Sequence, residues 1–126
     1  MRILRLALVA LSVAACSSPP PADLIPMPTS ASAGLFGPTA CPAALLEGEL
    51  LADDDFGFVV AHADGFASPV TWPHGYVARD APRRELLDDS GRVVAREGDL
   101  VALGGGETGA GPGFVVCGQL DVTPVP

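Results

Sequence analysis

The chain has 126 residues, a length that fits one compact domain and leaves little room for a second. Its 15 acidic residues outnumber the 7 basic ones, which are all arginines, and the formal net charge is −8. This balance excludes a nucleic-acid-binding protein, because contact with the phosphate backbone requires clustered Lys and Arg.

The N-terminus carries the pattern of an export signal. Arg2 and Arg5 provide a positive region, and residues 6–15 form an apolar run. A run of about ten residues is far shorter than the roughly 20 that cross a bilayer as a helix. We therefore predict that residues 1–15 are a signal peptide. The alternative is an ordinary secretory signal that releases a soluble protein.

The signal ends at Val13-Ala14-Ala15-Cys16, and this motif resembles the lipobox of bacterial lipoproteins. The resemblance implies that the Cys16 thiol receives a diacylglyceryl group with palmitate-type acyl chains and that the signal is cleaved before it. It also implies a cell-membrane protein, lipid-anchored and facing outside the cytoplasm. Since an acidic body is repelled by anionic head groups, the acyl chains must hold it without electrostatic help.

Residues 16–40 are predicted to be the lipidated Cys and a disordered tether. Pro, Ser, Ala and Gly dominate this segment, and Asp23 is its single charged residue. Such a composition cannot bury enough apolar surface to offset the entropy of ordering. As extended polyproline, the tether would span at most about 70 Å.

Residues 41–126 are predicted to be a compact β domain, because short apolar runs alternate with Gly, Asp and Pro. Between residues 44 and 51, Gly48 favours a strand over a helix. Leu46 and Leu50 then face one side, and Glu47 and Glu49 face the other. The further predicted strands are 56–62, 66–72, 85–88, 92–95, 99–103 and 114–122.

We expect residues 85–103 to form a three-stranded meander and residues 104–113 to form a flexible Gly-rich loop. Six or seven short strands indicate an all-β fold, either a small barrel or a sandwich. The favoured topology is a five-stranded barrel of the oligonucleotide/oligosaccharide-binding (OB) type.

A second pattern is similar to small exported β domains of unknown function from high-GC Gram-positive bacteria. It consists of turn and strand positions at residues 72–76, 86–88, 91–99 and 103–106. The resemblance implies a β fold and no particular activity.

Three cysteines occur in the chain. If Cys16 is lipidated, Cys41 and Cys117 remain at the two ends of the body. An exported location and an even remainder predict a Cys41–Cys117 disulfide. Neither thiol has the Cys-x-x-Cys spacing or the basic neighbour of a redox-active cysteine.

No residue pattern predicts a catalytic site, a metal site or a cofactor. His62 and Asp64, with His74, offer weak metal ligands, whereas the carboxylates at residues 53–55 are consecutive and do not alternate as in a calcium loop. The glycines at 104–106 are not followed by the Lys of a phosphate-binding loop. Ser68 and Ser90 lack a nucleophile motif.

Trp72, His74 and Tyr76 are the candidate ligand-binding residues, since aromatic side chains beside a Pro-Gly turn are suited to a sugar or a peptide. Burial of Trp72 in the core is the favoured alternative.

The sequence therefore predicts a non-enzymatic interaction or ligand-binding module at the cell envelope. Its expected partners are the membrane, through the lipid anchor, and an envelope protein or a wall component. The alternatives are an accessory domain that binds cell-wall glycan or peptide and an envelope hydrolase that uses paired carboxylates.

Overall fold

The computed structural model describes residues 23–31, 41–109 and 111–126. The predicted signal peptide and Cys16 lie outside these residues. The described residues form strands and no helix. The strands are β1 (Leu24–Ile25), β2 (Ala44–Asp53), β3 (Gly57–Ala61), β4 (Ala67–Thr71), β5 (Val77–Arg79), β6 (Glu85–Leu87), β7 (Val93–Arg96), β8 (Leu100–Gly106) and β9 (Phe114–Thr123). The all-β prediction is confirmed.

Five strands close into a barrel in the order β2-β3-β4-β9-β8, and β8 pairs with β2 to complete the ring. All neighbours are antiparallel except β4 and β9, which run parallel. Numbered along the chain within the barrel, this order is 1-2-3-5-4, with the third and fifth strands parallel. That is the OB topology favoured from the sequence.

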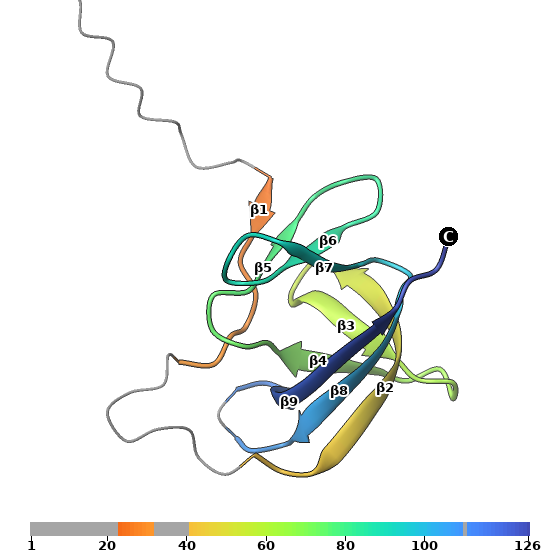
Figure 1. Ribbon diagram of the computed structural model, residues 1–126. Coiled ribbons are helices and arrows are strands. Elements are labelled where there is room, and N and C mark those ends of the chain that lie inside the picture. Colours follow the sequence, from red (N-terminus) through yellow and green to blue (C-terminus); the bar gives the residue numbers. More distant parts are fainter. Residues whose placement is uncertain (1–22, 32–40, 110) are drawn as a thin grey trace, which may run out of the picture.

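β2 has 10 residues and bends along its length (Figure 1), which lets it pair with two neighbours. Gly48 lies beside the position at which its partner changes. Its first half pairs with β8, from Ala44 to Glu49, and its second half pairs with β3, from Glu49 to Asp53. A Cβ at Gly48 would lie 2.2 Å from the carbonyl oxygen of Ala61, so no larger residue fits at the bend. The predicted alternation is confirmed, since Leu46 and Leu50 are buried and the two glutamates are exposed.

β1, β5, β6 and β7 form a second, four-stranded sheet, called here the cap sheet. β5, β6 and β7 lie in the connection between β4 and β8, β1 precedes the barrel strands, and the sheet sits above the barrel in Figure 1. The predicted meander over residues 85–103 is wrong in its pairing. The meander is β5-β6-β7, whereas β8 leaves it to join the barrel. Residues 104–106, expected in a loop, extend β8.

One core joins the barrel to the cap sheet. Apolar side chains from the barrel strands and from β5, β6 and β7 form a single buried cluster. Its fully buried members include Phe58, Val60, Val70, Trp72, Ala78, Leu86 and Leu103. Arg84 adds polar contacts, because its Nη1 donates to the carbonyl oxygens of Asp53 at 3.0 Å and Gly57 at 2.9 Å. The two sheets therefore form one folded unit.

Residues 23–31, called here the strap, cross from the cap sheet to the barrel. β1 pairs antiparallel with β5, and the backbone of Trp72 exchanges hydrogen bonds of 2.9 Å with Pro28 and Ser30. Met27 lies against Gly57 and joins the core. The prediction of disorder is therefore wrong for this part of the tether, because its apolar residues and backbone groups find partners on the body.

The predicted disulfide between Cys41 and Cys117 is present. Cys41 lies just before β2 and Cys117 lies within β9, with the two Cα atoms 5.7 Å apart. The bond joins the segment that precedes the first barrel strand to the last barrel strand, across 76 positions of the chain.

Candidate functional site

The three candidate ligand-binding residues do not form an exposed aromatic surface. Trp72 is fully buried in the core, so the favoured alternative is confirmed and the indole presents no face to a ligand. His74 is exposed, and its Nδ1 lies 3.3 Å from the carbonyl oxygen of Ser30. Tyr76 is partly buried against the core. Burial, together with the charges of Asp88 and Asp89, raises the pKa of the Tyr76 phenol.

A serine and a histidine meet at the end of the β3–β4 hairpin. His62 Nε2 lies 2.7 Å from Ser68 Oγ, a contact that the sequence did not indicate. The Asp64 carboxylate, which is near in the chain, accepts instead from the backbone N–H of Phe66. Within the part of the chain that the structure describes, no carboxylate completes a catalytic triad with this pair.

The metal interpretations find no cluster to support them. Residues 23–31, 41–109 and 111–126 contain no group of three or more His, Cys, Asp or Glu arranged to hold an ion. The carboxylate of Asp53 accepts from the backbone N–H groups of Asp55 and Phe56, both at 2.9 Å. The acidic triplet therefore belongs to the turn between β2 and β3, which the Asp53 side chain stabilises through these hydrogen bonds.

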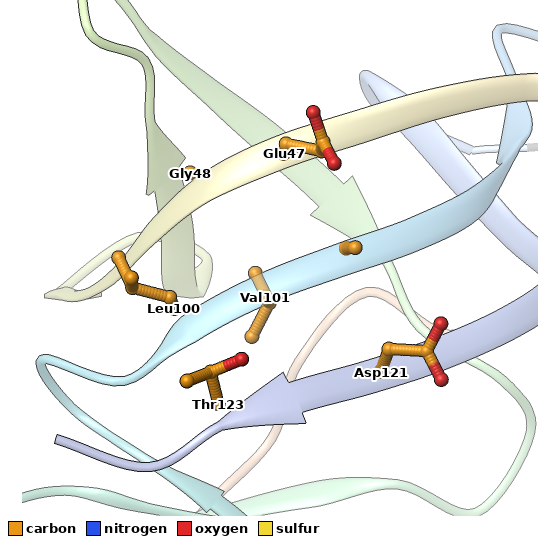
Figure 2. Close-up of a pocket in the computed structure, with 7 residues that line it drawn as sticks. Glu47, Gly48, Leu100, Val101, Asp121 and Thr123 are labelled. Atoms are coloured by element: carbon orange, nitrogen blue, oxygen red, sulfur yellow. The ribbon is translucent and has the colours of Figure 1, made fainter.

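A shallow groove lies on the outer face of the barrel, across β2, β8 and β9 (Figure 2). Its volume is about 250 Å³. It is lined by Glu47, Gly48, Leu100, Val101, Ala102, Asp121 and Thr123.

The strand register arranges outward residues of this face in two rows of three, of which all but Glu49 line the groove. Ala102 on β8 lies between Glu47 on β2 and Asp121 on β9. In the next row, Leu100 is paired with Glu49 and with Thr123. Figure 2 shows the carboxylates of Glu47 and Asp121 on opposite sides of β8. Two strand spacings separate them, which is about 10 Å.

The groove combines exposed charge with exposed apolar surface. Leu100 has 49% of its surface exposed, while Glu47, Glu49 and Asp121 are all solvent-exposed. Asp121 Oδ2 accepts a hydrogen bond of 3.1 Å from the side-chain amide of Gln119. The small side chain of Ala102 leaves the floor between Glu47 and Asp121 low. Such a site can take a positively charged group beside an apolar one.

The sequence predicted the β2 side of this groove and not the β9 side. Alternation along β2 placed Glu47 and Glu49 on the solvent face, but the partners of β2 were unknown. Asp121 lies 74 positions after Glu47, and only the pairing of β8 with both β2 and β9 brings the two into one row.

Comparisons of the chain with protein-family models, with curated proteins and with solved structures find no match. Among the described residues, there is no helix of the length and apolar character needed to cross a membrane.

Proposed function

We propose that the protein is an exported, lipid-anchored binding module that works at the outer face of a membrane and is not an enzyme. The observation that carries this proposal is the disulfide between Cys41 and Cys117, because disulfides persist in oxidising compartments outside the cytoplasm. The charged, apolar and lipobox-like segments of residues 1–16 support the same location.

The strap changes the expected reach of the anchor. Only residues 17–22 separate Cys16 from Asp23, where the strap begins on the body. A fully extended chain of seven residues spans at most about 25 Å. In a protein anchored at Cys16, the body is therefore held close to the bilayer and not at the 70 Å first allowed for the tether.

The binding role is supported by the outer face of the barrel. The groove across β2, β8 and β9 is open, acidic and partly apolar. The alternative surface for a wall glycan was based on Trp72 and Tyr76, but Trp72 is fully buried in the core and cannot contact a ligand. Binding of a protein segment is therefore the form of the proposal that we favour.

Crosslinking in cells tests this function. The protein is crosslinked, extracted from membranes in detergent and analysed by mass spectrometry, with Cys16→Ala as the control. We expect a reproducible protein partner that is lost when the anchor is lost. Turnover of an envelope substrate that disappears after a single carboxylate substitution would overturn the proposal in favour of a hydrolase.

A further inference from the structure

The outer faces of β2, β8 and β9 form one continuous surface. Alternate residues of each strand point outward, and the register aligns two rows of them across the three strands. The β8–β9 register shifts between Leu103 and Gly105, so the alignment ends beyond these two rows. The outward positions are Leu45, Glu47 and Glu49 on β2, Leu100, Ala102 and Gly104 on β8, and Gln119, Asp121 and Thr123 on β9. Leu45 and Leu100 are 53% and 49% exposed, so apolar surface borders the carboxylates on this face.

The charges of the molecule are unevenly divided between its two sheets. After residue 5, every Arg lies between residues 79 and 96, within the cap sheet and its turns. The ion pairs among the described residues all join residues between 79 and 99. The five barrel strands contain no Lys or Arg, and none of the ion pairs formed among residues 23–31, 41–109 and 111–126 includes Glu47, Glu49 or Asp121.

These features point to a partner of opposite charge. Two carboxylates about 10 Å apart leave space for a guanidinium or ammonium group over the low floor at Ala102. Leu100, one row away, offers an apolar contact to the neighbouring side chain of the same partner. In an extended peptide, residues i and i+2 lie on one side, a spacing that matches successive rows of the sheet.

We propose that this groove binds an extended segment of a partner protein in which Lys or Arg side chains adjoin an apolar side chain. The inference rests on the proposed function, since the partner is what the anchored module would hold. Charge complementarity fixes the sign of the segment, and the exposed leucines fix its amphipathic character. An anionic or a purely polar segment does not fit.

The test uses the full-length protein in detergent and a fluorescent peptide of repeated Arg-Ser-Leu-Ser units, called the Arg-Leu peptide, in which Arg and Leu lie on the same side of the extended chain. A peptide of Glu-Ser-Leu-Ser units, called the Glu-Leu peptide, is the matched probe. We expect the Arg-Leu peptide alone to bind, and to bind more weakly as ionic strength rises. The double variant Glu47→Gln/Asp121→Asn should weaken binding about tenfold, because it removes both flanking charges and keeps the side-chain shapes.

The control is Asp54→Asn/Asp55→Asn, which changes the net charge equally in the exposed β2–β3 turn. It should leave the affinity within about twofold, since that turn lies outside the groove. Ala102→Trp should also abolish binding by filling the floor. Its fold is checked by circular dichroism and by its unfolding midpoint, and the amide variants test the proposal independently of it.

Two results would overturn the groove assignment. One is an equal loss of affinity in the groove variant Glu47→Gln/Asp121→Asn and in the control Asp54→Asn/Asp55→Asn. That result would show that the peptide is attracted by net charge alone. The other is no binding of the Arg-Leu peptide to the unaltered protein at low salt. Membrane attachment is measured separately: binding without attachment refutes the anchor, and attachment without binding refutes the groove.

Discussion

Asp99 connects three parts of the molecule through a buried carboxylate. The residue is 4% exposed, and its Oδ1 accepts from Arg83 Nη2 at 2.8 Å and from the backbone N–H of Val125 at 3.1 Å. Its Oδ2 accepts from the backbone N–H of Arg96 at 2.8 Å. Burial alone would raise the pKa of Asp99, but the hydrogen bonds from Val125, Arg96 and Arg83 outweigh it and lower that pKa.

Asp99→Asn should destabilise the fold at neutral pH by about 2 kcal/mol, because hydrogen bonds to a charged acceptor are lost and an amide N–H₂ faces backbone donors. A carboxyl whose folded-state pKa is lowered stabilises the protein above its unfolded pKa, and this stabilisation is lost as the pH falls through the folded value. The difference between the two proteins should therefore shrink below about pH 4.

Urea denaturation of both proteins at pH 7 and at pH 3 measures this difference. Asp89→Asn, an exposed carboxylate in the β6–β7 turn, is the control and should have little effect at either pH. Equal destabilisation at the two pH values would contradict the role of the charge.

Gly48→Ala should destabilise the fold by about 1–3 kcal/mol, since the added Cβ would meet the carbonyl oxygen of Ala61 at the bend of β2. Gly118→Ala is the matched control, because a Cβ there would make ordinary contacts of 3.4 Å. Thermal unfolding of the two variants compares them. A Gly48 variant as stable as the control would show that the bend tolerates a side chain.

At this scale, the sequence predicted local patterns and not distant contacts. The alternation of Leu46, Glu47, Glu49 and Leu50 follows from the two-residue period of a strand, so one face could be assigned without knowing the neighbours. Asp99 offered no such signal, because its partners come from positions 83, 96 and 125.

The strap is the element on which the sequence and the structure differ most. Its Pro-rich composition indicates disorder. Composition alone cannot predict that the segment pairs with the edge strand β5 or that its backbone forms hydrogen bonds with Trp72. The barrel strands were predicted well, since short apolar runs between turn residues mark them. β5 was missed because three residues give no readable period.

Ile25→Asp should release the strap, because Ile25 is partly buried against the core and a carboxylate there would be desolvated. Hydrogen exchange of residues 23–31 should become faster in this variant. Leu24→Asp is the control, since Leu24 is the exposed neighbour in β1 and points to the other side of the strand. Equal protection of the strap in the two variants would contradict its docking through Ile25.

In the whole molecule, the disulfide ties the segment before β2 to β9, and the strap ties the chain to β5 and Trp72. Replacing Cys41 and Cys117 by Ala should lower the free energy of unfolding by about 4 kcal/mol, because the bond closes a long loop. Urea denaturation with and without a reducing agent checks this. A reduced protein that unfolds at the same urea concentration would show that the bond adds nothing to the barrel.

The two sheets also differ in where they would face. The strap attaches to the cap sheet, so the lipid anchor that we propose at Cys16 would hold that sheet toward the bilayer. The acidic barrel then faces away from anionic head groups, which is the arrangement that electrostatics favours. The groove on β2, β8 and β9 belongs to the barrel and is left accessible to a partner.

The measurement that tests the central claim most directly is the intact mass of the protein purified from the membrane fraction of its own cells. We predict a chain that begins at Cys16 and carries acyl groups on that residue, with Cys41 and Cys117 joined. A chain that starts elsewhere, or an unmodified Cys16 on a protein found in the soluble fraction, would contradict the proposal of a lipid-anchored module.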